Sequence, residues 1–142
     1  MKLFYITILI GFFSLTIANE VALVKKFKGT AHVEREGKAV PIEVGTKVFQ
    51  KDTIVTKSNS LVGLMFKDNT RISVGSKSKF VIEEYLFDPE EGKESFVSDL
   101  QKGSIACVTG LISKINPNAF KLKVKTASIG IRGTHFIVNA DK

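Results

Sequence analysis

The sequence predicts an all-β protein: a single domain of short strands, stacked as a sandwich-like or solenoid-like set of sheets, behind an N-terminal signal peptide. Two observations carry the fold prediction. Turn-forming clusters recur about every eight to twelve residues, and the segments between them are rich in aliphatic and aromatic residues without a convincing amphipathic helix. The turn clusters are Glu36-Gly37, Val44-Gly45, Lys57-Ser58-Asn59, Asp68-Asn69, Gly75-Ser76, Asp88 to Gly92, Lys102-Gly103 and Asn116-Pro117-Asn118.

The first 18 residues predict export. Lys2 supplies a positive charge, and Leu3 to Ile17 then runs without any charge, as the apolar region of a secretory signal peptide does. Thr16 and Ala18 are small residues at the positions that signal peptidase requires, which predicts cleavage after Ala18. A membrane span needs about 20 apolar residues, so retention as an anchor is the alternative, and we expect a periplasmic protein without a stable membrane span.

The mature chain would comprise residues 19–142, or 142 minus 18 = 124 residues, which is the size of one domain. Without Lys2 it carries 20 basic and 14 acidic side chains, and its net charge of +6 favours anionic partners such as acidic glycans. No nucleic-acid motif is present, so we expect no binding to nucleic acid. The single cysteine, Cys107, lies in an apolar run and is expected to be buried.

Four segments between the turns have the composition of half-buried strands. They are Thr30 to Arg35, Leu61 to Phe66, Thr70 to Val74 and Phe80 to Tyr85. Leu61 to Phe66 is apolar on both sides, which predicts a central strand, and Asp68-Asn69 predicts a tight turn into the strand that follows.

A fifth segment shows the clearest alternation, with one apolar and one basic face. Its apolar residues are Phe120, Leu122 and Val124, and its basic residues are Lys121, Lys123 and Lys125. The lysines form either a solvated sheet face or guarded edge, or a stripe that binds a polyanion.

The sequence carries no recognisable catalytic or metal-binding pattern. His32 and His135 lie far apart, and the chain has neither a nucleophile elbow nor a phosphate-binding loop. Glu83 and Glu84 are consecutive in a predicted strand, so they are expected to point to opposite faces and not to cooperate as acid and base. We therefore expect no enzyme activity, cofactor, metal or small-molecule substrate.

Three segments in a fixed order resemble the FecR-like domain family. The first combines Val44-Gly45 with Lys51 to Thr56, the second runs from Val62 to Thr70, and the third runs from Thr126 to Val138 and contains Arg132-Gly133-Thr134-His135-Phe136. Gly103, which opens a strand, fits the same pattern. The resemblance covers about residues 27–139.

The resemblance implies an all-β domain outside the cytoplasm that serves as a binding or signalling module. Archetypal members take a signal from a TonB-dependent outer-membrane receptor and pass it through a transmembrane helix to a cytoplasmic sigma-factor regulator. This sequence has a signal peptide in place of the regulator and the helix, so we expect any signalling to go through a separate partner. It also stops soon after the Arg-Gly-Thr segment, as either a minimal version or a truncated chain.

We interpret most of the motif residues as structural. These are Gly45, Asp52, Thr56, Asp68, Gly103, Gly133, Thr134 and Phe136. Asp52 and Thr56 suit side-chain-to-backbone bonds in turns, whereas Arg132 either ties loops together or grips an anionic partner. The sequence thus predicts a non-catalytic module that binds a protein or envelope component. The alternative is an envelope-glycan or anionic-surface binder that uses Lys121, Lys123, Lys125 and Arg132.

Overall fold

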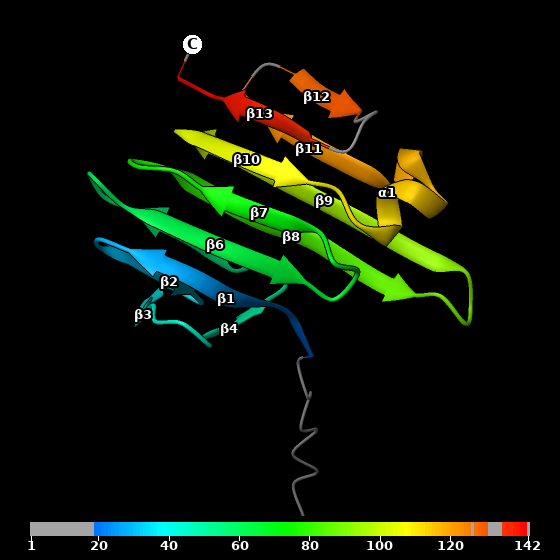
Figure 1. Cartoon of the computed structure of the whole chain (residues 1–142), viewed down its shortest axis with the longest axis horizontal. Coiled ribbons are helices and arrows are strands. Elements are labelled where there is room, and N and C mark those ends of the chain that lie inside the picture. The colour runs from blue at the N-terminus through cyan, green and yellow to red at the C-terminus, as the bar shows by residue number, and fades with distance from the viewer. Residues whose placement is uncertain (1–18, 126, 131–134, 142) are drawn as a thin grey trace, which may run out of the picture.

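The computed structural model describes residues 19–125, 127–130 and 135–141, which form two β-sheets that enclose one core (Figure 1). The first sheet has six strands in the order β13 (His135–Asn139), β10 (Ser104–Val108), β7 (Arg71–Val74), β6 (Leu61–Phe66), β1 (Glu20–Lys28) and β4 (Lys47–Phe49). The second has seven strands in the order β12 (Ala127–Gly130), β11 (Phe120–Val124), β9 (Lys93–Lys102), β8 (Lys79–Asp88), β5 (Thr53–Thr56), β2 (Ala31–Arg35) and β3 (Lys38–Pro41). The all-β, single-domain prediction is confirmed as a two-layer sandwich.

The predicted strands are found with small changes at their ends. β6 has the predicted bounds and lies between β7 and β1, so its central position is confirmed. The turn at Asp68-Asn69 joins β6 to β7 as an antiparallel hairpin, also as predicted. In β11, Phe120 and Leu122 are buried while Lys121 and Lys123 are exposed, which confirms the alternation of apolar and basic faces.

A β-bulge corrects one expectation. The pairing of β8 with β9 shifts register between Ile82 and Glu84, so Glu83 and Glu84 both lie outside the core while Ile82 and Tyr85 on either side are buried. The expected opposite placement of the two glutamates was wrong, because a bulge puts two consecutive residues on one side of the strand.

The two sheets are joined at their centre by a line of packed aromatic rings. Phe66 of the first sheet lies 5.3 Å from Tyr85 and 4.6 Å from Phe96 of the second sheet, measured between ring centroids. Phe96 continues the line to Phe120 at 4.8 Å, and Phe120 to Phe136 at 6.3 Å. Tilted and edge-on ring pairs at these distances stabilise a core beyond their buried area.

One short helix departs from the expected all-strand pattern. α1 (Leu111–Ile115) and the 3-10 turn η1 (Pro117–Ala119) follow β10, and the chain then enters β11, which pairs with β9 in parallel. A parallel pair needs such a crossover, because a tight hairpin reverses the direction of the chain. No helix among the described residues is long and apolar enough to cross a membrane.

Asp68 fixes this helix against the β6–β7 hairpin. Its carboxylate is fully buried and accepts hydrogen bonds from the Tyr85 hydroxyl at 2.8 Å, the Thr70 hydroxyl at 2.7 Å and the Ile112 amide at 3.1 Å. The Leu111 amide donates to the Asp68 carbonyl at 2.8 Å. The N-cap residue of α1 is Gly110, which has no side chain to cap the helix, so Asp68 supplies the cap from a distant turn.

Gly110 is required at this contact because a Cβ there would lie 2.3 Å from the Asp68 carbonyl oxygen and 2.4 Å from the Thr70 nitrogen. Burial, together with the nearby Asp68 charge, raises the pKa of the Tyr85 hydroxyl well above its ordinary value. The hydroxyl therefore keeps its proton and donates to the carboxylate.

We expect the substitution Tyr85→Phe to lower the free energy of unfolding by about 2 kcal/mol, because it leaves a buried carboxylate without one donor while the aromatic packing is kept. Urea denaturation of the wild type and the variant measures this loss. The control is Ser98→Ala, which removes a buried hydroxyl that has no hydrogen-bond partner among the described residues.

Ser98 of β9 is 1% exposed, and its hydroxyl has no hydrogen-bond partner among the described residues. Its register partners Ile82 and Leu122 are both fully buried, so the hydroxyl lies in an apolar layer. We expect Ser98→Ala to raise the free energy of unfolding by about 1 kcal/mol, because a buried unpaired hydroxyl costs more than it contributes. A lower stability in the same urea titration would show that the hydroxyl has a partner.

Candidate functional site

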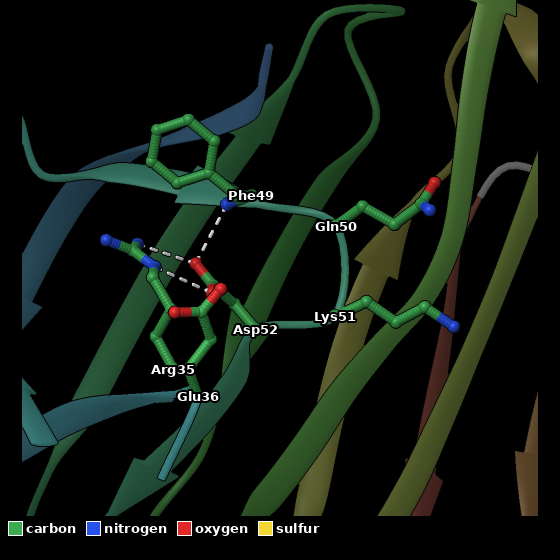
Figure 2. Close-up of a pocket in the computed structure, with 6 residues that line it drawn as sticks. All are labelled: Arg35, Glu36, Phe49, Gln50, Lys51 and Asp52. Carbon is green, nitrogen blue, oxygen red and sulfur yellow. Dashed lines mark hydrogen bonds and ion pairs between the residues drawn. The ribbon is translucent and has the colours of Figure 1, made fainter. Parts of the chain in front are cut away.

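A pocket of about 410 Å³ opens where β2 turns into β3 and β4 turns toward β5 (Figure 2). Its lining residues are Arg35, Glu36, Phe49, Gln50, Lys51 and Asp52. β4 belongs to the first sheet and β5 to the second, so the pocket lies at a point where the chain crosses between the sheets.

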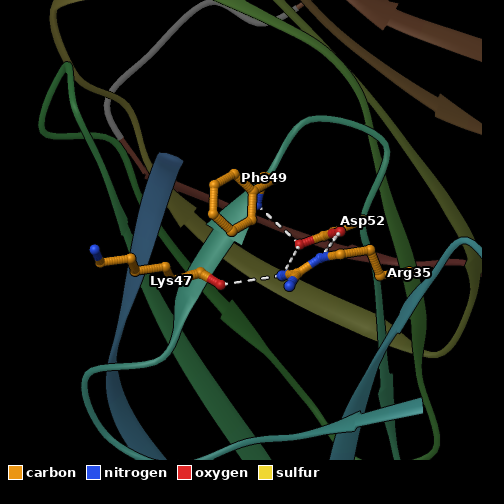
Figure 3. Close-up of polar contacts among 4 residues, drawn as sticks. All are labelled: Arg35, Lys47, Phe49 and Asp52. Carbon is orange, nitrogen blue, oxygen red and sulfur yellow. Dashed lines mark hydrogen bonds and ion pairs between the residues drawn. The ribbon is translucent and has the colours of Figure 1, made fainter. Parts of the chain in front are cut away.

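The base of the pocket is a fixed ion pair (Figure 3). Arg35 donates from Nε to Asp52 Oδ1 at 2.9 Å and from Nη2 to Asp52 Oδ2 at 2.7 Å, and Nη2 also donates to the Lys47 carbonyl at 3.2 Å. The Phe49 amide donates to Asp52 Oδ2 at 2.8 Å, and the guanidinium lies 4.6 Å from the centroid of the Phe49 ring. A planar guanidinium suits both the two-pronged bond and the stacking, which a lysine cannot reproduce.

Asp52 is 1% exposed, so its charge is neutralised within the fold. The hydrogen bonds to Asp52 raise the pKa of the Arg35 guanidinium above its ordinary value, against the opposing effect of burial. The backbone fixes the same segment to β8: the Lys51 amide donates to the Ile82 carbonyl at 2.7 Å, and the Ile82 amide donates to the Asp52 carbonyl at 3.0 Å. The base of the pocket is therefore rigid.

Two charged residues at the rim have an unusual backbone conformation. Glu36 has φ of 52° and Lys51 has φ of 77°, in the left-handed region that favours Gly and Asn. The surrounding structure holds both conformations: the two-residue loop of the β2–β3 hairpin requires positive φ at Glu36 and Gly37, and the bond from the Lys51 amide to the Ile82 carbonyl holds Lys51. The pocket lining thus includes one acidic and one basic residue together with the Phe49 ring.

The pocket lining combines charged, amide and aromatic groups. No group of three or more metal-ligating side chains occurs in the described part of the chain, and the pocket is lined by no hydroxyl, thiol or imidazole group. Cys107 is buried elsewhere in the core, and burial raises the pKa of its thiol to about 12, so the thiol stays protonated at neutral pH.

The structure places the other predicted motif residues at turns and crossovers. The Thr56 hydroxyl donates to the Gly75 carbonyl at 2.6 Å and accepts from the Ser78 amide at 2.9 Å. Gly45 has φ of 96° in the turn before β4. A Cβ at Gly103 would lie 2.0 Å from the Ser78 hydroxyl oxygen, so this position requires glycine.

The three lysines predicted to bind an anion or partner are not brought to the pocket. Lys121 and Lys123 are exposed on β11 and Lys125 follows the strand, while Lys123 Nζ is 2.8 Å from Glu83 Oε2. This ion pair raises the pKa of Lys123. β11 has neighbours on both sides, so its lysines do not guard a sheet edge, and their role as a solvated face or as a stripe that binds a polyanion stays a prediction.

The last motif is only partly described. Arg132, Gly133 and Thr134 lie outside the described residues. Phe136 of β13 is partly buried and packs against the core.

Sequence reasoning missed Arg35 and Phe49, the two residues that complete the site around Asp52. Arg35 and Asp52 are 17 residues apart, and nothing local marks them as partners. The available signal was the predicted turn at Glu36-Gly37, which directly follows Arg35, whereas the turn at Gln50-Lys51 was not predicted.

Comparison with known proteins gives two findings. The family model described as FecR protein matches residues 52–142. A solved structure described as a cell surface anchoring domain is similar over 43% of this chain and 82% of its own, with 24% identity and a TM-score of 0.42. The curated proteins contain no match. The family match begins at Asp52, yet β1 to β4 complete the same two sheets, so the folded unit extends before the matched region.

We expect Arg35→Lys to lower the free energy of unfolding by about 1–3 kcal/mol, because one ammonium group cannot replace the bonds to both oxygens of a buried carboxylate. Arg71→Lys is the matched control, since Arg71 is exposed and has no ion pair within the described structure. Guanidinium denaturation compares the two. Equal stability of the two variants would contradict a structural role for the Arg35–Asp52 pair.

Proposed function

The chain belongs to the FecR protein family, and from this premise we propose that it is an exported, non-catalytic binding and signalling module that engages a protein partner or another envelope component. In this proposal residues 1–18 direct export and are removed, and residues 19–142 act in the periplasm. The uncharged stretch from Leu3 to Ile17 supports the export step.

The observation that carries the proposal is the strained, charged rim over a rigid base. Glu36 and Lys51 are held with φ of 52° and 77°, and neither side chain takes part in the hydrogen bonds between Arg35 and Asp52. Residues kept in a costly conformation beside a preformed pocket support a role in contact with another molecule. Because the rim carries opposite charges, it suits a polar protein loop as a partner better than it suits a uniformly charged surface.

We expect a photoreactive amino acid in place of Lys51 to give a cross-linked product with a single protein partner in intact cells. The additional substitution Glu36→Gln is expected to lower the yield of that product about fivefold, since a rim charge steers and orients a partner. Mass spectrometry of the product identifies the partner, and immunoblotting measures the yield.

The matched control places the same photoreactive residue at Lys93, an exposed position at the start of β9. Equal products from positions 51 and 93 would show non-specific contact. Recovery of the chain without any partner from both positions would contradict the proposal.

A further inference from the structure

The chain crosses between the two sheets four times at one end of the described sandwich, the left-hand end in Figure 1, at residues 28–30, 57–60, 75–78 and 102–104. These crossovers connect to β1, β6, β7 and β10, which are consecutive neighbours in the first sheet. Neighbouring strands lie about 4.8 Å apart, so the four crossovers form a regular stack about 14 Å long.

Direct hydrogen bonds join each crossover to the next. The Lys57 amide donates to the Thr30 carbonyl at 3.0 Å, and the Lys77 amide donates to the Lys57 carbonyl at 3.0 Å. The Ser104 amide donates to the Ser78 hydroxyl oxygen at 3.0 Å, which closes the step to the fourth crossover. The stack is therefore a continuous ladder with a fixed spacing.

Each crossover also carries one exposed lysine. We call these four residues the lysine row: Lys28, Lys57, Lys77 and Lys102. The four crossover segments contain no aspartate or glutamate, and none of the four lysines has an ion pair within the described structure. The neighbouring fifth turn contributes Asp141, whose carboxylate accepts the Gly103 amide at 3.1 Å. Lys57 and Lys77 are joined directly through their backbones. Lys28 lies opposite Leu61 at the end of β1, and Lys102 lies opposite Lys79 at the end of β9. The row is therefore a positively charged band across this end of the sandwich, and Asp141 lies at one side of it.

The conformation of Lys77 indicates that this charge is retained at a cost. Each crossover has one residue with positive φ, and in three of them it is Gly29 (82°), Asn59 (52°) or Gly103 (80°), the residue types that tolerate it. In the remaining crossover it is Lys77, with φ of 50°. A glycine would fit this position with less strain, so the fold alone does not explain a lysine there.

We propose that the lysine row is a binding site for a linear anionic polysaccharide, whose successive negative charges contact successive ammonium groups. The row uses residues different from those of the Arg35–Asp52 pocket and does not depend on the function proposed for it. A membrane surface is a poorer fit because none of the four crossovers contains an exposed large apolar side chain. Among the residues whose burial is described, such side chains occur elsewhere, at Val44, Leu86, Leu111, Ile115 and Ile137. Serine, threonine and asparagine separate the lysines instead.

The test measures binding of the full chain to polygalacturonate, a polymer with one carboxylate per sugar, by calorimetry at low and at physiological salt. The triple variant Lys57→Gln, Lys77→Gln, Lys102→Gln is expected to bind about tenfold more weakly, and the affinity of the wild type is expected to fall as salt rises. The matched control is Lys121→Gln, Lys123→Gln, Lys125→Gln, which removes the same charge from the β11 face and is expected to change the affinity less than about twofold.

The single variant Lys77→Gly separates binding from folding. It is expected to weaken binding about threefold while keeping or raising the free energy of unfolding, because it removes the strain together with the charge. Equal losses in the two triple variants, a loss confined to the β11 variant, or no binding by the wild type would overturn the proposal. Tighter binding to anionic phospholipid vesicles or duplex DNA than to polygalacturonate would overturn the assignment to a glycan.

Discussion

The hydrogen bonds of the buried Asp68 carboxylate are the interactions on which one end of the sandwich depends, the end opposite the four crossovers. It joins the β6–β7 hairpin of the first sheet to Tyr85 of the second, and it caps α1, the helix that carries the chain toward the parallel pair β9–β11. A buried carboxylate without its donors is costly, so the hairpin, the tyrosine and the helix must assemble together. The aromatic line from Phe66 to Phe120 is packed around the same point.

Asp52 plays a comparable part at the connection between β4 and β5, where the pocket lies. Like Asp68, it is buried between two strands and both of its oxygens accept hydrogen bonds, but one of its partners is the charged side chain of Arg35. The result is a neutral, rigid base on which the strained rim can be held. Two buried carboxylates therefore fix the β4–β5 connection and the β6–β7 hairpin, and the exposed charges of the rim and of the lysine row take no part in these bonds.

The sequence predicted those parts of the fold that depend on neighbours along the chain. The alternation in β11, the apolar run of β6 and the turn at Asp68-Asn69 are local patterns, and each was found where expected. β1 and β9 were missed because their charged outward residues and register shifts obscure the alternation. α1 was missed because a five-residue helix is too short to show a helical period.

The sequence by itself determined the all-β class, the family pattern and the positions of most turns, because strand alternation and turn chemistry act over a few residues. Only the tertiary structure decided which side chains meet. Arg35 reaches Asp52 across 17 residues and Asp68 reaches Ile112 across 44, distances over which the sequence contains no pairing signal. The lysine row likewise exists only because hydrogen-bonded crossovers stack four separate segments at the spacing of neighbouring strands.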